Sequence, residues 1–213
     1  MPRTKSASAH RKVLDAALEL IGEHGVEATS MDAIAGRSGV SKATIYKHWA
    51  DKDALLLELT GLLAGLNSRP AVNTADTRAG MIAVLAYRPP EDTQARERTM
   101  PHLGAYAARN QAFGIAWRKM VMEPPRRELT QLIEQGVAKR ELSASLDTNL
   151  ALALLLGPMI YWKALANKCE QDDQRALADQ VVDAFWRAFG KSRNDDPPRT
   201  RSAAPSARRL RRS

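Results

Sequence analysis

Apolar residues recur every three to four positions along most of the chain, a spacing that predicts helices rather than strands. The first predicted helix runs through Val13 and Ile21 and closes near Gly25. Pro124 and Pro125 remove two amide donors and should kink or split one long segment, where the break could shape a cavity. The fold class is therefore all-α, and the later predicted helices cover 31–37, 42–49, 52–67, 75–87, 92–108, 111–140, 147–167 and 173–190.

Start and stop signals are densest between Thr29 and Asp53. Ser30 can cap one short helix, and Gly39 can end it because glycine accepts a positive φ. Ser41 can then cap a second helix. Two short helices separated by three or four residues form a helix-turn-helix, a motif that grips DNA.

The second of these helices has an outward polar face. It offers cations for phosphates, polar groups for base edges and an alanine small enough to let the helix approach a groove. The alternative is a plain helical hairpin whose cations only face solvent. Trp49 fits that alternative and is expected in the core, whereas Tyr46 and Lys47 are expected to contact DNA and His48 suits either reading. The face consists of Lys42, Ala43, Thr44, Lys47 and His48.

The motif Ile-Ala-x-x-x-Gly-Val-Ser-Lys-x-Thr-Ile-Tyr-x-His-Trp, followed by Lys-Asp-x-Leu, resembles the signature of the tetracycline-repressor (TetR) family. The resemblance covers about 10–63 and, more loosely, 124–190. It departs from the usual pattern at Ala43, where many members have Gly, and at Trp49, where many have Phe. It implies base contacts from Lys42, Ala43, Thr44 and Lys47, and phosphate contacts from Ser41, Tyr46, His48 and Lys52.

The same resemblance implies a linking helix after the motif and a larger helical domain for ligand binding and dimerisation. The last two predicted helices are the most apolar, and in the family the corresponding pair makes a four-helix dimer bundle. The alternative is that their side chains pack only within the monomer. An effector pocket rests mainly on the resemblance, and taken singly each candidate residue fits plain core better. The few charges on those faces suggest a mainly apolar small molecule. The candidates are Met100, His102, Tyr106, Phe113, Trp117, Met120, Met159 and Tyr161.

Composition places the 213 residues among globular proteins, with 44% apolar and 26% charged residues. The net charge of +8 is concentrated at the C-terminus, where eight Lys or Arg against two Asp from Lys191 onward give +6 and leave +2 for the rest. This tail cannot bury enough apolar surface to fold and is expected to be disordered. It is either a solubilising extension or an arm that adds phosphate contacts.

Other classes of protein find little support. The apolar run 150–162 is too short to span a bilayer and is expected to be a buried helix. The polar start lacks a secretion signal, and a single Cys169 gives no disulfide framework, so we expect a cytoplasmic protein. No metal-ligand spacing, nucleophile elbow or phosphate loop is present, which argues against an enzyme, a metal site and a cofactor. Cys169 is expected to be structural, with a redox-sensing thiol as the alternative.

The sequence thus predicts a helix-turn-helix domain at 9–52, a ligand-binding and dimerisation domain at 53–190 and a disordered Arg-rich tail at 191–213. The predicted function is a transcriptional regulator, usually a repressor, that binds a palindromic operator in double-stranded DNA as a homodimer and is released by a small molecule. The alternative is a constitutive architectural DNA-binding protein without an effector. Neither operator nor effector can be deduced from these residues.

Overall fold

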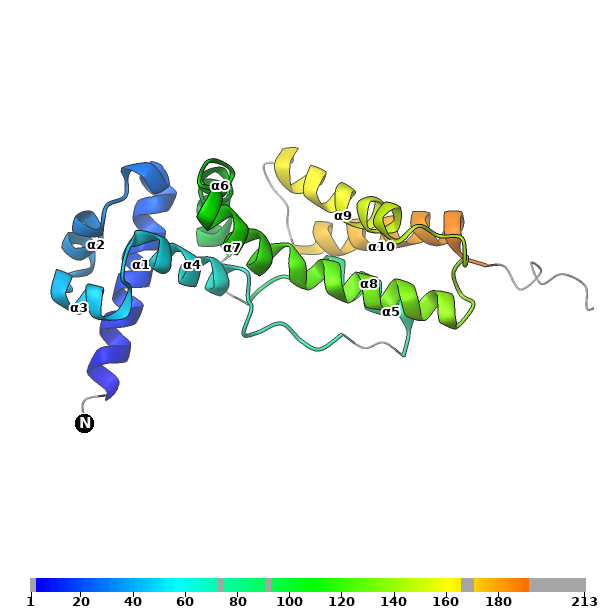
Figure 1. The fold of residues 1–213 in the computed structure, drawn as a ribbon, viewed down its shortest axis with the longest axis horizontal. Coiled ribbons are helices and arrows are strands. Elements are labelled where there is room, and N and C mark those ends of the chain that lie inside the picture. The colour runs from blue at the N-terminus through cyan, green and yellow to red at the C-terminus, as the bar shows by residue number, and fades with distance from the viewer. Residues whose placement is uncertain (1–2, 73–74, 91–92, 166–170, 192–213) are drawn as a thin grey trace, which may run out of the picture.

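The computed structural model describes residues 3–72, 75–90, 93–165 and 171–191, and these residues form ten α-helices. Figure 1 shows an elongated molecule with α1–α3 at one end, α4, α6 and α7 in the middle and α5 and α8–α10 at the other end. The described part contains no β-strand, only an isolated bridge between Leu142 and Gly190. The predicted all-helical fold class is confirmed. The helices are α1 Arg3–Ala28, α2 Met31–Ser38, α3 Lys42–His48, α4 Lys52–Leu63, α5 Thr77–Ala86, α6 Thr93–Arg109, α7 Gln111–Val121, α8 Glu123–Ala138, α9 Thr148–Leu165 and α10 Gln171–Phe189.

The helix boundaries around α2 and α3 follow the predicted signals. Ser30 accepts a hydrogen bond from the Ala33 amide, and Ser41 accepts one from the Thr44 amide. Gly39 lies in the left-handed region at φ 66° and ends α2. Each of these local features satisfies backbone groups that a helix end leaves without partners. The turn between the two helices is therefore specified by adjacent residues alone.

Two boundaries differ from the predictions. Helix α1 begins at Arg3, earlier than the predicted domain start, and its path breaks at Gly25, where φ is 81°. Helix α4 ends at Leu63 rather than near residue 67. The Leu66 amide donates to the Gly61 carbonyl and the Gly65 amide to the Leu62 carbonyl, with Gly65 at φ 64°. This pair of bonds is the Schellman arrangement, which stops a helix even where the apolar pattern continues.

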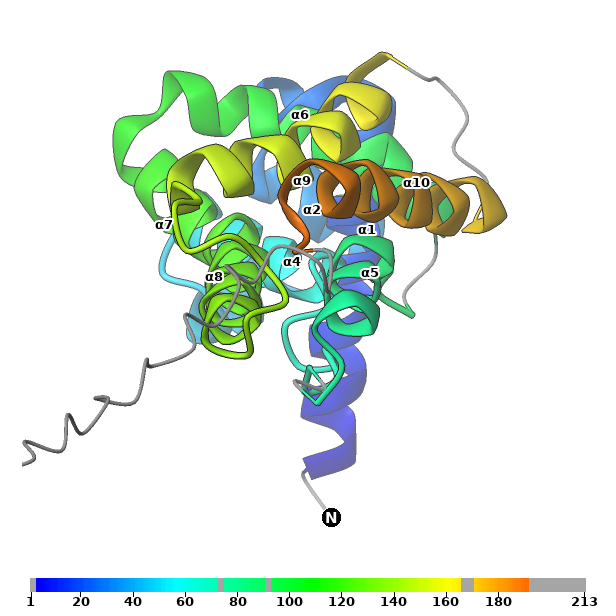
Figure 2. The same ribbon diagram turned by 90° about the vertical axis from the view of Figure 1, so that its right-hand side faces the viewer.

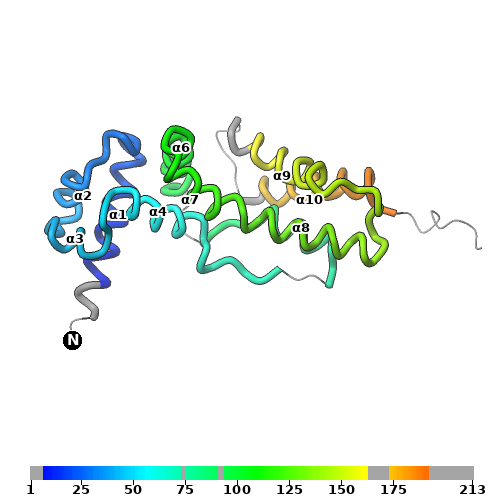
Figure 3. The backbone as a smooth tube through the Cα atoms, in the orientation of Figure 1, coloured from blue at the N-terminus to red at the C-terminus, as the bar shows by residue number. Residues whose placement is uncertain are grey.

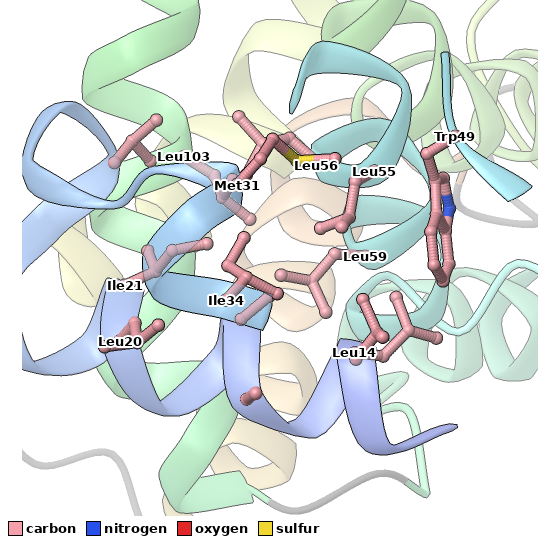
Figure 4. Close-up of a cluster of buried hydrophobic side chains, with 14 of the residues drawn as sticks. Leu14, Leu20, Ile21, Met31, Ile34, Trp49, Leu55, Leu56, Leu59 and Leu103 are labelled. Atoms are coloured by element: carbon pink, nitrogen blue, oxygen red, sulfur yellow. The ribbon is translucent and has the colours of Figure 1, made fainter. Parts of the chain in front are cut away.

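One core joins the helix-turn-helix to the helices behind it. Figure 4 shows side chains of α1, α2 and α4 meeting around Ile34 and Leu59, with Trp49 at the edge and Leu103 entering from α6. Ile34 and Leu59 have no exposed surface, and Trp49 is 2% exposed. The prediction that Trp49 belongs to the core is confirmed. Burying such side chains is the main force that fixes α3 against α1 and α4.

The long segment predicted at 111–140 is split, as the two prolines suggested. Helix α7 ends at Val121, Met122 connects the two helices, and α8 starts at Glu123. Pro124 and Pro125 fall in the first turn of α8, where amides have no acceptor within the helix. The proline pair is therefore tolerated there, but it cannot lie inside one continuous helix.

A second core lies among α5, α8, α9 and α10 (Figure 2). Within α9, Leu152, Leu155 and Met159 are buried in it. The expectation of a buried helix at 150–162 is wrong for the opposite face of α9, which is exposed: Leu150 by 51%, Leu154 by 43% and Ile160 by 54%. The tube in Figure 3 shows α9 and α10 side by side at the end away from α3. Among the described residues, no helix is long and apolar enough to cross a membrane.

Candidate nucleic-acid interface

Helix α3 lies at the end of the molecule formed by α1–α3 (Figure 1), and its polar residues are exposed there. Ile45 points inward and is 1% exposed, which fixes the rotation of the helix about its axis. The residues on the other side are exposed, except Thr44, which is half-buried. We call these outward residues the recognition face, and they are Lys42, Ala43, Thr44, Tyr46, Lys47 and His48.

Two contacts hold polar groups at the start of this face. Lys42 Nζ lies 2.7 Å from Asp32 Oδ1, and both side chains are more than half exposed. The Ser41 and Thr44 hydroxyls lie 2.9 Å apart, and the Ser41 oxygen also caps α3. Exposed ion pairs contribute little to stability, so Lys42 can exchange Asp32 for another anion at low cost.

An imidazole and an indole anchor the far end of α3 to α1 and α4. The His10 ring stacks on Trp49 with centroids 4.6 Å apart, and the His48 ring meets His10 edge-on at 5.3 Å. Glu58 joins the group through both oxygens: Trp49 Nε1 donates to one at 2.7 Å, and His10 Nε2 lies 2.9 Å from the other. Trp49 is thus buried with its one donor satisfied, as an indole requires.

Lys52 lies behind the recognition face rather than on it. Its Nζ donates to the Val26 carbonyl at 3.1 Å and to the Thr29 carbonyl at 3.2 Å, and it sits 5.8 Å from the centre of the Tyr106 ring. These bonds tie the start of α4 to the end of α1. An ammonium has three donors, so one donor is left for the phosphate contact implied by the family resemblance.

Arg37, near the end of α2, pairs with two acids of α1. Its guanidinium lies 3.0 Å from Glu19 and 3.2 Å from Glu23. The hydrogen bond to Glu23 and then that to Glu19 raise the pKa of Arg37, and the same bond lowers the pKa of Glu23. Arg37 therefore holds α2 on α1, and the sequence analysis gave no signal for that pairing.

Helix α1 places residues beside the recognition face that the motif did not predict. An open groove separates its first turns from the α2–α3 turn. Ser8 and Lys12 form one wall, while Gly39, Val40, Ser41 and Thr44 form the other. Ser8 and Lys12 are four residues apart and so lie on one side of the helix. The only available signal was that spacing, which also occurs on ordinary solvated faces.

The structure brings together some of the predicted ligand-binding residues but not all of them. Met100, Tyr106, Phe113 and Trp117 belong to or pack against the first core, and Met120 lies close to Gly61 on α4. His102 lies beside Gly25 of α1. Met159 belongs to the second core and Tyr161 is 68% exposed, so these two do not join the others.

Two other features of the sequence fall outside the part of the chain that the structure describes. They are Cys169 and all of the Arg-rich tail after Lys191. Within the described part, no group of three or more His, Cys, Asp or Glu side chains could hold a metal ion.

Comparison with known proteins places this geometry in context. Residues 13–59 match the family model described as bacterial regulatory proteins, tetR family, and residues 71–185 match the tetracyclin repressor-like C-terminal domain. The HTH-type transcriptional regulator YdeS of Bacillus subtilis is 30% identical over 184 residues, which cover 86% of this chain and 91% of YdeS. MftR of Mycobacterium tuberculosis, named as a regulator of mycofactocin biosynthesis, is 29% identical over 68% of this chain and 79% of its own.

Solved structures agree in fold. A TetR transcription regulator of Haloarcula marismortui has a TM-score of 0.69 at 20% identity and covers 87% of this chain and 100% of its own. A TetR-family regulator of a Rhodococcus species has a TM-score of 0.67 at 21% identity, covering 84% of this chain and 98% of its own.

Proposed function

Because the chain belongs to the TetR family of transcriptional regulators, which are not enzymes, we propose that it is a repressor that binds a palindromic operator as a homodimer and leaves it when a small effector binds. The observation that carries the proposal is the recognition face of α3, which is exposed and polar and is held by a buried Ile45. A helix presented in this way fits the major groove of DNA. Lys42, Ala43, Thr44 and Lys47 would read base edges, and Ser41, Tyr46, His48 and Lys52 would contact phosphates.

The exposed side of α9 supports the homodimer. Leu150, Leu154, Ile160, Tyr161 and Trp162 are between 39% and 68% exposed and follow one another along the helix. Contiguous apolar surface of this kind marks interaction sites in globular proteins. The neighbouring α10 exposes small side chains, Ala176, Ala184 and Ala188, against which a second copy could pack closely. A two-fold pair would place two α3 helices for half-sites about 34–36 Å apart.

Contacts between α6 and the first helices support release by an effector. Tyr106 donates to Asp53 on α4 at 2.8 Å, and Asn110 caps α7 while its amide lies 3.5 Å from the same carboxylate. Burial, and then the hydrogen bond to Asp53, raise the pKa of Tyr106. Arg109 pairs with Glu27 of α1. A ligand that moved α6 would therefore act on both helices that hold α3.

Selection of random duplex DNA on the purified protein tests this function. Enriched duplexes should carry a palindrome with half-sites one helical turn apart, bound at least about 10³-fold more tightly than random DNA. Sedimentation of the complex should give two chains per site. If no sequence were enriched and DNA affinity fell steeply with salt concentration, the architectural alternative would be favoured instead.

A further inference from the structure

The open groove between the first turns of α1 and the start of α3 is large enough to hold part of a ligand. Helix α1 passes beside α3 at this end of the molecule (Figure 1). The groove has a volume of about 520 Å³, whereas one water molecule occupies roughly 30 Å³ in the liquid. A phosphodiester group with its bound water therefore fits without movement of either helix. The lining residues are Ser8, Ala9, Lys12, Gly39, Val40, Ser41 and Thr44.

Lys12 gives the groove a positive charge. Its side chain is exposed, and no acidic side chain is among the described residues that line the groove. The adjacent Arg11 pairs with Asp15 at 2.8 Å, whereas Lys12 makes no ion pair within the described part of the chain. An ammonium has three hydrogen-bond donors and no acceptor, so the partner that Lys12 suits is an anion.

The opposite wall of the groove supplies a hydroxyl donor. The Ser41 and Thr44 hydroxyls lie 2.9 Å apart, so one of them donates to the other. The Thr44 amide also donates to Ser41 Oγ, at 3.3 Å. Each hydroxyl carries one proton, so whichever hydroxyl donates within the pair, the proton of the other is left for an acceptor outside it. The groove thus offers donors on both walls, which suits an anion with more than one oxygen.

We propose that a backbone phosphate of the operator enters this groove and binds Lys12 on one wall and the Ser41–Thr44 hydroxyl pair on the other. This contact rests on the proposed binding of DNA by α3 and extends that interface to α1. Thr44 belongs to both the groove and the recognition face, so a duplex lying on that face runs past the groove. A phosphodiester carries one negative charge and two free oxygens, one for each wall.

A phosphate in the groove would hold the DNA strand at the start of α3. His48 lies at the other end of the same helix, so two phosphate contacts would fix the direction of α3 in the major groove. Phosphate contacts position a protein on DNA but carry no sequence information directly. Removal of the Lys12 charge should therefore weaken binding to every duplex alike and leave the ratio of operator to random affinity unchanged.

Operators with one methylphosphonate test the contact, because this group replaces a charged phosphate oxygen by a methyl group. The phosphates of the selected operator are neutralised one at a time in both half-sites. Wild-type protein should lose affinity at least about 5-fold at the phosphate in the groove, because a hydrogen bond to a charged group is lost. Lys12→Gln should bind the intact operator more weakly by a similar factor and show no further loss at that phosphate.

Arg11→Gln is the matched control. Arg11 is the adjacent exposed cation of α1 but does not line the groove, so this variant should keep the wild-type response at every phosphate. Thermal unfolding without DNA should be the same for Lys12→Gln and wild type, because Lys12 is exposed and makes no ion pair among the described residues. A Lys12→Gln variant that responds like wild type at every phosphate, or that loses affinity for only one base step, would overturn the proposal.

Salt dependence on a random duplex separates the groove contact from the proposed repressor function. The slope of log affinity against log salt concentration should be shallower by about 0.9 per bound chain in Lys12→Gln than in wild type. This difference does not depend on whether an operator is found. If wild-type protein selected no operator, the repressor function would be refuted while the slopes still tested the groove. Equal slopes would refute the groove contact and leave sequence-specific binding intact.

Discussion

Two exposed surfaces of the described residues, the recognition face of α3 and the outer face of α9, differ in chemistry. The recognition face of α3 is polar, so water can satisfy its groups until DNA replaces it. The exposed face of α9 is apolar, and leaving it in water costs free energy at all times. The difference indicates that the first surface is suited to reversible binding and the second to a partner that stays.

The largest expected effect is on the α9 surface. Leu154→Glu would put two charges into the proposed dimer interface, and burying an unpaired carboxylate is costly, so we expect the dimer Kd to rise at least about 100-fold. Sedimentation velocity over a concentration series measures this. Ile115→Glu is the control, because Ile115 is 57% exposed on α7, outside the proposed interface. Equal sedimentation of the Leu154→Glu variant and wild type would remove α9 from the interface.

On the recognition face the expected loss of affinity is smaller, and it concerns discrimination between operator sequences. Lys47→Ala should weaken operator binding by about 1–3 kcal/mol and relax the preference at one base step, with unfolding unchanged. Binding to a set of single-base operator variants measures both quantities. Lys119→Ala removes an exposed cation from α7 and should change neither. A uniform loss on every duplex would assign Lys47 to phosphate instead.

The parts of the structure that could be predicted are those in which the interacting residues are close together in the sequence. Each helix boundary here is set by nearby residues: Ser30 and Ser41 accept hydrogen bonds from amides three residues ahead, and Gly39 ends α2 through its left-handed backbone. The sequence alone therefore predicted α2, α3 and the turn between them. The proline pair likewise marked the break before α8, and a buried Trp49 followed from helical spacing. These features depend on neighbours in the chain or on burial alone.

Features that depend on distant residues were not predictable in the same way. The bonds of Lys52 to two carbonyls join residues 23 and 26 positions apart. The apolar run of α9 did not indicate which side would stay exposed, because periodicity cannot distinguish a core from an interface between chains; only the family resemblance implied a dimer surface there. The position of Lys12 beside the recognition face required a relative placement of helices that no local signal encodes.

Lys52 allows a sharper test of this division between local and distant effects. Lys52→Met removes two hydrogen bonds from a charged donor and should lower the free energy of unfolding by about 1–2 kcal/mol, which urea denaturation measures. If Lys52 also contacts phosphate, the slope of log affinity against log salt concentration becomes shallower by about one for each half-site. An unchanged slope with lower stability would restrict Lys52 to tying α4 to α1.

The smallest expected effect is electrostatic and lies beside the recognition face, at Arg37. The folded-state pKa of Glu23 is lowered by its hydrogen bond from Arg37, so the stabilisation is present above the ordinary glutamate pKa and disappears as pH falls through the lowered value. Arg37→Gln should return the pKa of Glu23 toward its ordinary value, which a carbon-13 NMR titration of the carboxyl group measures. Because the pair is exposed, the change in the free energy of unfolding should be small. Operator affinity should fall only to the extent that the Arg37 contact holds α2 in position. A Glu23 pKa that stayed low in the variant would mean that another cation, such as His24 at 3.4 Å, holds the carboxylate.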